Sequence, residues 1–382
     1  MKILINTSTL YLGGGVQVAI SFLNELTKIE DSNEYFILIS KEISKQLNKS
    51  IFNDRFEFFL IEKSPSSLLS RFSIIQQLDK IENKIKPDII FTVFGPSYWR
   101  PKGKHIIGFA DGWVYNSDTI AYSKLSFLNK IKMKLLKRYK TYYLNRDADY
   151  IIIETEDAKQ KLSKIININT DKIFVVGNTY SEVFNKPINF LEKNKFFIKL
   201  PQKQIDEHRL LYIAHNHPAK NLDIIKLVIP YLKNFNIKFV LTIDNKSFDK
   251  MFKNTIAENY IINLGSISSK SCPSVYMQCD YLFAPTLLET FSAAYPESMI
   301  MKKPILTTEY SFAKDICQDS AIYFNPMDPI DISNKIISLL ENKELQKKLV
   351  KKGLKRVASF ETAKSRARKY IMLCSKIVSK EK

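Results

Sequence analysis

Two glutamates that stand eight positions apart, Glu289 and Glu297, offer carboxylates that could orient a polar ligand. They lie in the stretch YLFAPTLLETFSAAYPESMIMKKPILTT, whose pattern predicts an apolar strand at Tyr281–Ala284, a polar turn, an Ala-rich helix and a second strand at Pro304–Thr308. Open α/β sheets bind ligands in loops at the carboxyl ends of their strands, and a carboxylate is favourable near a helix N-terminus. A capped surface helix with two solvated glutamates explains the same spacing, so that alternative stays open.

A second candidate cluster, HNHPAKN at 215–221, follows a predicted strand at Arg209–Ala214. Lys220 would begin the next helix, where its ammonium group and the helix dipole both favour an anion. His215 could donate a hydrogen bond to a phosphate, although an imidazole lacks the fixed charge and bidentate geometry of a guanidinium. His215 and His217 could instead be metal ligands, but the sequence offers no third ligand, so we expect no metal site.

Further candidates lie near the start of the chain, where residues 1–39 read strand, glycine loop, helix and strand. Backbone N–H groups at Gly14 and Gly15 could meet a phosphate or a sugar, although a plain tight turn would also use these glycines. Asp111 follows a predicted strand at His105–Phe109, at the carboxyl end where a ligand would bind. An Asp-Gly turn explains Asp111 equally well.

The Glu-x7-Glu spacing, followed by a small-residue helix and a Lys-Pro strand, resembles the retaining, nucleotide-sugar-dependent glycosyltransferases of family 4. Their usual run is close to P-S-x-x-E-G-F-G-x-x-x-x-E-A-M-x-x-G-x-P-V. This chain keeps Pro285, Glu289, Phe291, Glu297, Met299 and Pro304. It has Thr290 and Ser292 where glycines are usual. Lys220 and Asn221 match the loop that reads roughly G-R-x-x-x-x-K-N in the family, with His215 at the arginine position.

The resemblance implies an α/β protein of the GT-B fold, in which two Rossmann-like, doubly wound parallel-sheet domains face each other across a cleft. Alternation of predicted strands and helices along the chain agrees with parallel sheets. We expect an acceptor-binding domain at 1–184, a linker at 185–206 and a nucleotide-sugar-binding domain at 207–357. A C-terminal helix at 358–382 would cross back to the first domain.

The resemblance also implies roles for the candidate residues. Glu289 would orient the donor sugar and stabilise positive charge at its anomeric carbon, and Asp111 is the second catalytic candidate. Donor-binding candidates are Gly14, Gly15, His215, Lys220, Phe291, Ser292 and Glu297. Lys220 and His215 would contact the diphosphate, and Glu297 the ribose hydroxyls. The donor would be a nucleoside-diphosphate sugar, which is a co-substrate, and we expect no cofactor and no metal.

One further motif, D-x-D at Asp147–Asp149, is the metal-binding signature of a different glycosyltransferase fold, GT-A. Here it directly precedes the apolar run at 150–153, so we predict a helix-to-strand connection and no metal site.

The formal net charge of +19 implies an anionic partner such as nucleic acid, an acidic membrane surface or a phosphorylated substrate. No nucleic-acid-binding motif accompanies it, so we expect no nucleic-acid partner. The segment 124–146 holds eight Lys or Arg and no acid. Its apolar positions recur at helical spacing, which predicts a basic amphipathic helix for an anionic membrane surface. A helix packed on its sheet with a solvated basic face is the alternative.

The four cysteines show no C-x-x-C spacing, which indicates neither a zinc site nor a disulfide framework and favours a reducing cytoplasm. No secretory segment and no apolar run of about 20 residues is apparent. We therefore expect a cytoplasmic protein, peripheral on the inner face of the cell membrane. The expected function is retaining transfer of a hexose to a glycan or polyprenyl-linked acceptor, in bacterial surface polysaccharide or O-antigen biosynthesis. A nucleotide-sugar epimerase of the same fold and an inactive basic binding protein remain alternatives.

Overall fold

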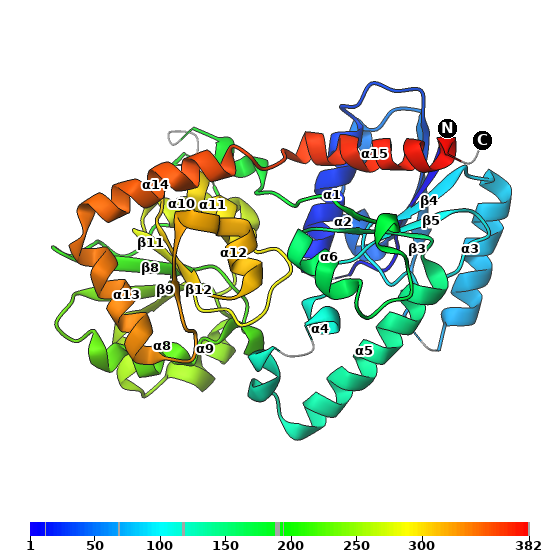
Figure 1. Cartoon of the computed structure of the whole chain (residues 1–382). Helices are drawn as coiled ribbons and strands as arrows, with labels where there is room; N and C mark the ends of the chain where they lie inside the picture. Colours follow the sequence, from blue (N-terminus) through cyan, green and yellow to red (C-terminus); the bar gives the residue numbers. More distant parts are fainter. Residues whose placement is uncertain (12, 68, 117–118, 188–191, 194, 381–382) are drawn as a thin grey trace. The chain divides into compact units, whose positions relative to one another are not determined.

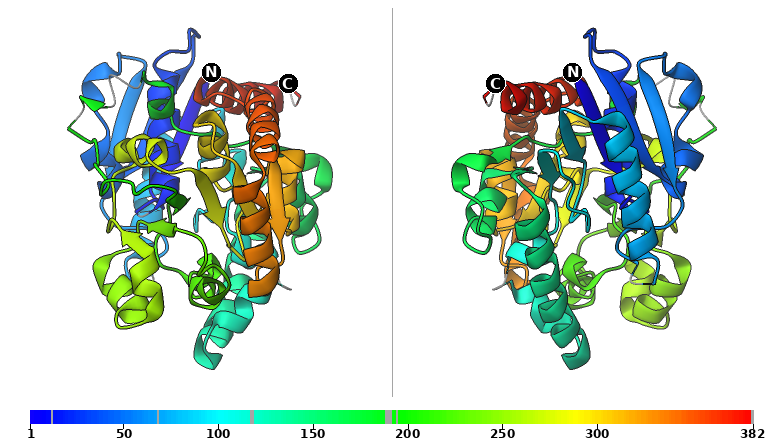
Figure 2. Two further views of the ribbon diagram at one scale, coloured as in Figure 1. Left: turned by 90° about the vertical axis from the view of Figure 1, so that its left-hand side faces the viewer. Right: turned by 90° about the vertical axis from the view of Figure 1, so that its right-hand side faces the viewer.

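The computed structural model describes residues 1–380 except 12, 68, 117–118, 188–191 and 194. The chain forms two compact units, each built on one parallel sheet (Figures 1 and 2). Unit 1 comprises Met1–Ser117, Leu128–Asn178 and Glu361–Lys382, and unit 2 comprises Asp118–Phe127 and Thr179–Phe360. The predicted pair of doubly wound parallel-sheet domains is thereby confirmed. The domain that we expected at 1–184 includes two segments, 118–127 and 179–184, that the structure groups with unit 2.

Unit 1 contains a seven-stranded sheet in the order β3-β2-β1-β4-β5-β6-β7, with every neighbouring pair parallel. The strands are β1 (Lys2–Thr7), β2 (Glu34–Ser40), β3 (Phe56–Ile61), β4 (Ile89–Thr92), β5 (His105–Gly108), β6 (Tyr150–Ile153) and β7 (Ile173–Val175). The inner strands are near-continuous apolar runs because helices cover both faces of such a sheet. The strand order reverses between β1 and β4, so the topological switch point of this sheet lies between these two strands.

The helices of unit 1 are α1 (Gly14–Leu26), α2 (Lys41–Gln46), α3 (Arg71–Ile85), α4 (Gly112–Tyr115), α6 (Glu156–Leu162), α15 (Ala363–Ser379) and α5 (Phe127–Asp147), whose first residue is counted with unit 2. The last helix, α15, returns to unit 1 and lies beside α1 (Figure 1). Tyr370 packs edge-on against Phe22, with ring centroids 5.2 Å apart. Arg366 donates a hydrogen bond to Asn178, whose amide donates to Glu154 at 2.8 Å. These contacts join the two points where the chain leaves and re-enters the unit.

Unit 2 contains a six-stranded parallel sheet in the order β10-β9-β8-β11-β12-β13. Its strands are β8 (His208–Tyr212), β9 (Ile237–Leu241), β10 (Ile261–Asn263), β11 (Tyr281–Ala284), β12 (Ile305–Thr308) and β13 (Ala321–Phe324). Its helices are α8 (Ile224–Val228), α9 (Asn245–Phe252), α10 (Cys272–Met277), α11 (Ala294–Ile300), α12 (Ser311–Cys317), α13 (Pro329–Glu341) and α14 (Lys343–Val357). The order reverses between β8 and β11, so the switch point lies between the two motif-bearing loops.

The linker expected at 185–206 falls partly on residues 188–191 and 194, which lie outside the described residues. Its described end packs onto unit 2. Leu200 is buried in the core of that unit, and its backbone N–H donates to Gln278 Oε1 at 2.9 Å. The backbone N–H of Ile198 donates to Ser274 Oγ at 3.0 Å. This end of the segment is therefore part of unit 2.

Candidate functional site

The switch point of unit 2 joins the two loops that carry most of the candidate residues. The carbonyl oxygen of Ala219, in the loop after β8, accepts hydrogen bonds from two groups of the loop after β11. These are the backbone N–H of Leu287 at 2.7 Å and the hydroxyl of Thr286 at 3.0 Å. Because both donors and the acceptor are fixed by adjacent strands, the two loops are held in one arrangement. Their facing side chains therefore form one site at the carboxyl edge of the sheet.

Lys220 and Glu289 meet directly in this site. The Lys220 ammonium contacts Glu289 Oε1, and the two side chains keep 16% and 17% of their exposure. Burial alone would lower the pKa of Lys220, but the neighbouring Glu289 carboxylate outweighs it and holds that pKa well above its usual value. The structure thus brings together the residues expected at the diphosphate and at the sugar. Both side chains remain partly accessible to a ligand.

Tyr212 lies at the end of β8, close to this ion pair, and sequence reasoning did not single it out. Its side chain is buried, and burial raises the pKa of its hydroxyl to about 12, so the phenol is neutral. Nothing in its sequence context distinguishes it from an ordinary core tyrosine. Only the pairing of β8 with β11 places it beside Lys220 and Glu289.

The two histidines before Lys220 have different roles. His217 caps the short helical turn Pro218–Lys220, because its Nδ1 accepts the Ala219 backbone N–H at 3.2 Å. His215 is exposed, with its ring 6.2 Å from that of His217. Partial desolvation of the ring and the nearby Lys220 charge lower the pKa of His215, so its imidazole is neutral near pH 7. Within the described ranges, no group of three His, Cys, Asp or Glu side chains could hold a metal ion.

The second glutamate, Glu297, lies on α11, which is only seven residues long. Burial raises the pKa of its carboxyl to about 7, and a hydrogen bond from the Tyr276 hydroxyl, 3.3 Å from Oε2, opposes this shift. The helix begins after Ser292, whose carbonyl accepts the Tyr295 N–H at 3.2 Å, and it ends where Lys302 adopts a left-handed backbone with φ 58°. Glu297 is therefore a half-buried carboxylate poised to change charge near neutral pH.

The loop between Glu289 and Glu297 accommodates Thr290 and Ser292 at the positions where the family usually has glycines. Neither Thr290 nor Ser292 has a positive φ, so neither position requires glycine. Phe291 packs edge-on against Phe360, with ring centroids 6.2 Å apart. The missing glycines therefore cause no backbone strain.

The glycine loop of unit 1 follows β1 and begins α1. Gly13 has φ 74°, a conformation that favours glycine, and it precedes the helix. A Cβ on Gly14 would meet nothing within 4 Å, and one on Gly15 would make ordinary contacts with Leu10 and Phe94. The backbone conformation thus requires glycine at Gly13. Gly14 and Gly15 place their backbone N–H groups at the helix N-terminus.

Asp111 has two structural partners in unit 1. Its Oδ1 accepts the Trp113 N–H at 3.1 Å and caps α4, as the Asp-Gly turn alternative anticipated. Its Oδ2 forms an ion pair with Lys140 of α5, and the two side chains keep 23% and 21% of their exposure. Lys140 was hidden among the lysines of the basic segment, where spacing alone could not single it out. The Asp111 carboxylate is accordingly paired, yet still open to solvent.

The basic segment forms α5, whose first half is not covered by the sheet of unit 1 (Figures 1 and 2). Leu128 and Leu135 of its apolar stripe keep 76% and 60% of their exposure. The second half is anchored, because Tyr143 and Leu144 are buried and Arg71 donates to the Tyr143 hydroxyl at 2.6 Å. The alternative of a helix packed on its sheet therefore holds only for the second half. No helix in the described ranges is long and apolar enough to cross a bilayer.

The D-x-D residues are structural, as predicted. Asp147 ends α5, is buried, and pairs with Arg146. Asp149 pairs with Arg100 at 2.7 Å and accepts the His105 backbone N–H at 2.9 Å. The motif therefore forms the connection between α5 and β6, which begins at Tyr150.

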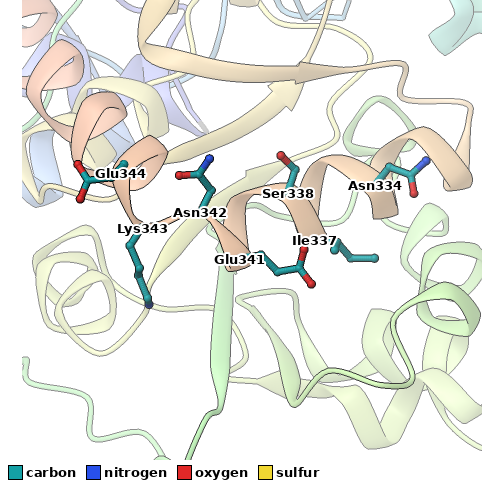
Figure 3. Close-up of a pocket in the computed structure, with 7 residues that line it drawn as sticks. All are labelled: Asn334, Ile337, Ser338, Glu341, Asn342, Lys343 and Glu344. Atoms are coloured by element: carbon teal, nitrogen blue, oxygen red, sulfur yellow. The ribbon is translucent and has the colours of Figure 1, made fainter.

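The hollow shown in Figure 3 lies between α13 and α14 and has a volume of about 620 Å³. It is lined by Asn334, Ile337, Ser338, Glu341, Asn342, Lys343 and Glu344. None of the candidate residues lines it. The site is therefore defined by the side chains at the switch point and not by this hollow.

Comparison with protein families finds that residues 192–356 match the model described as glycosyl transferases group 1. Among curated proteins, an uncharacterized glycosyltransferase of Methanocaldococcus jannaschii is 23% identical over 218 residues, covering 54% of this chain. The match spans 60% of the length of that relative. The matched family segment contains Lys220, Glu289 and Glu297, which are the residues with the clearest geometry.

Two solved structures show similarity along almost the whole chain. The crystal structure of Anabaena HepE in complex with UDP and glucose has a TM-score of 0.71 at 12% identity, covering 98% of this chain and 100% of that one. A glycosyltransferase of Rickettsia africae has a TM-score of 0.73 at 17% identity, covering 99% of this chain and 98% of that one. At these identities the likeness shows the fold, which is that of GT-B proteins.

Proposed function

We propose that this chain, which carries a domain of the group 1 type, is a glycosyltransferase that moves a hexose from a nucleoside-diphosphate sugar to an acceptor with retention. The observation that carries the proposal is the direct Lys220–Glu289 contact at the switch point of unit 2. A cation for the diphosphate and a carboxylate for the sugar stand side by side there. Glu297, with a half-buried carboxyl in the same unit, is assigned to the ribose hydroxyls.

The chemistry follows from the charges. Departure of a nucleoside diphosphate builds negative charge on its phosphate oxygens, and nearby cations stabilise that charge. The donor diphosphate would take over Lys220 as its counterion, with His215 as an additional hydrogen-bond donor. Glu289 would then face the anomeric carbon, where positive charge develops. A front-face route, in which the leaving phosphate oxygen accepts the acceptor proton, accounts for retention without a covalent catalyst or a metal.

The structural neighbour in complex with UDP and glucose supports a uridine nucleotide as the first donor to test. The acceptor would be a glycan or a polyprenyl-linked sugar of surface polysaccharide or O-antigen assembly. The supporting feature is α5, which presents exposed apolar and basic side chains together.

The test is the exchange Glu289→Gln, measured by release of UDP from a panel of UDP-hexoses in the presence of bacterial membranes as acceptor source. We expect turnover to be abolished while the affinity for UDP stays within about threefold, because the carboxylate acts on the sugar. The matched control is Glu309→Gln, an exposed glutamate of the same unit. Full turnover in Glu289→Gln would remove the core of the proposal. Sugar interconversion without membranes would favour an epimerase.

We further propose that α5 binds an anionic membrane surface and keeps the protein on the inner face of the cell membrane. Lys130, Lys134 and Arg138 are exposed alongside the exposed leucines of the same helix. A basic amphipathic helix with these two features gains both apolar burial and attraction to anionic lipids. The exposed apolar stripe favours a membrane surface over nucleic acid as the partner of α5, because exposed leucines add little to the binding of nucleic acid.

The membrane test uses two variants with the same change in net charge. In the first, Lys130, Lys134, Lys137 and Arg138 become Glu, and in the second Lys347, Lys348, Lys351 and Lys355 of α14 become Glu. We expect only the first to lose co-sedimentation with vesicles of phosphatidylglycerol and phosphatidylcholine. Equal loss in both would indicate attraction by net charge alone and contradict a docking role for α5. Salt-sensitive binding to nucleic acid without UDP release would favour the basic binding protein.

A further inference from the structure

A buried tyrosine of unit 2, Tyr276, contacts the carboxylate assigned to the ribose. Tyr276 lies on α10, has no exposed surface, and places its hydroxyl 3.3 Å from Glu297 Oε2. The same hydroxyl lies 3.2 Å from the carbonyl oxygen of Ala294, in the first turn of α11. A phenol has one proton to donate, so it can bond to only one of these acceptors at a time.

We infer that Tyr276 is the positioning residue that aims the Glu297 carboxylate at the ribose hydroxyls of the donor. This inference rests on the proposed function of Glu297. When the hydroxyl bonds to Glu297 it restrains Oε2, whereas Oε1 accepts no hydrogen bond from the described residues and stays available to a ligand. A carboxylate held by one oxygen loses less rotational freedom on binding than an unrestrained one, so the contact favours nucleotide affinity.

The contact has two protonation states with different bonding. When Glu297 is ionised, Tyr276 donates to its carboxylate. When Glu297 is protonated, its own O–H can donate to the tyrosine oxygen, and the tyrosine can turn to Ala294. The ionised carboxylate accepts hydrogen bonds from the ribose hydroxyls more strongly than the protonated acid does, so binding is expected to strengthen as the pH rises through the pKa of Glu297, about 7.

Among the described residues, the titratable groups coupled to Glu297 are Cys272 and Tyr276, and neither changes charge in this range. Burial and the Glu297 charge raise the pKa of the Cys272 thiol to about 12, so this thiol stays neutral. Burial raises the pKa of Tyr276 itself well above its usual value. Helix α14 packs against α11 with Gly353 facing Met299, and this contact is uncharged. A pH dependence near neutrality in the ratio of the affinities for UDP and for a UDP that lacks the ribose hydroxyls would therefore report Glu297, because both nucleotides carry the same phosphates.

The competing explanation is that Tyr276 only fills the core, where its ring packs edge-on against Phe184 at 5.6 Å. Tyr276→Phe keeps this packing and removes only the hydroxyl. Tyr295→Phe is the matched control, because Tyr295 is also fully buried and its hydroxyl bonds to Thr307 at 2.8 Å, away from Glu297. Both variants lose one buried hydrogen bond.

The experiment compares the affinities of the full-length protein for UDP and for 2′,3′-dideoxy-UDP by calorimetry from pH 6 to pH 9. We expect Tyr276→Phe to weaken UDP binding about tenfold at pH 8, the effect of one charge-assisted hydrogen bond. The ratio of the two affinities should fall toward the value of Glu297→Gln, because the lost affinity belongs to the ribose hydroxyls. The pH midpoint of UDP binding should rise, because Tyr276 no longer stabilises the ionised carboxylate.

Identical ratios and midpoints in Tyr276→Phe and Tyr295→Phe would overturn the inference while leaving the proposed function intact. Wild-type protein that binds no nucleotide would count against the proposed function instead. A ligand-free measurement then decides the positioning contact. Infrared titration of the Glu297 carboxylate, identified by its loss in Glu297→Gln, should show a higher pKa in Tyr276→Phe than in Tyr295→Phe. An unchanged pKa would refute the contact.

Discussion

Replacing Glu297 by glutamine should make the protein more stable while weakening its nucleotide site. Burial raises the pKa of Glu297 from 4.5 to about 7. Between these values the folded state keeps a proton that the unfolded state releases, so stability falls as the pH rises through this window and is level above it. A shift of this size corresponds to about 3 kcal/mol at pH 8 and to roughly 1 kcal/mol at pH 5.

Glutamine carries no charge to desolvate, and its amide oxygen can still accept a hydrogen bond from Tyr276. Glu297→Gln should therefore be more stable than the wild type by about 3 kcal/mol at pH 8, with most of this gain absent at pH 5. The assay is urea unfolding followed by far-ultraviolet circular dichroism at both pH values. The two tryptophans, Trp99 and Trp113, lie in unit 1, so their fluorescence separately reports the unit that carries no mutation.

The control is again Glu309→Gln, which changes an exposed glutamate of unit 2 and should leave stability within about 0.5 kcal/mol at both pH values. The reasoning would be refuted if Glu297→Gln were no more stable than the wild type at pH 8. It would also fail if the gain were equal at pH 5 and pH 8, because the pH dependence is the signature of the buried charge.

Two further predictions address the fold and the donor site. A Cβ at Gly108 in β5 would lie 2.0 Å from the Val93 carbonyl oxygen, so Gly108→Ala should destabilise unit 1 by about 3 kcal/mol. Tryptophan fluorescence should then show unit 1 unfolding at lower urea, and an unchanged midpoint would contradict this packing. His215→Arg restores a fixed charge where burial and Lys220 lower the pKa of the imidazole, so UDP affinity at pH 8 should rise about tenfold by calorimetry. Unchanged affinity would place His215 away from the diphosphate.

Local pattern was sufficient to predict the strands that build both sheets. Strand β11 begins and ends at the predicted residues, and β5, β8 and β12 lie within two residues of the predicted ranges at each end. A short apolar run that ends at a proline, such as Tyr281–Ala284 before Pro285, is typical of a parallel strand that is buried on both faces. Such a run therefore predicts both the strand and its end. The loops that follow these strands were therefore also located correctly, and with them Lys220 and Glu289.

Contacts between residues that are distant in the sequence could not be predicted from the local sequence pattern. The Asp111–Lys140 pair spans 29 positions and the Tyr276–Glu297 contact spans 21, and each depends on how two helices pack. Periodicity indicated that α5 is amphipathic, but it could not show that Leu128 and Leu135 lack a covering partner. Whether another element covers an apolar stripe depends on tertiary packing, which the spacing of residues along the helix does not predict.

A nucleoside-diphosphate site at Lys220 is central to the proposed transfer reaction, and a thermal-shift screen with UDP, GDP, ADP and TDP tests for it directly. A ligand that binds only the folded state at a hundred times its Kd adds about 2.7 kcal/mol, which corresponds to a rise of roughly 5–10 °C in Tm for a unit of this size. We predict such a rise with one of the four nucleotides and little or none in Lys220→Met. A matched control, Lys226→Met, removes another paired lysine of the same unit and should keep the shift. No shift with any nucleotide, or an undiminished shift in Lys220→Met, would contradict the account.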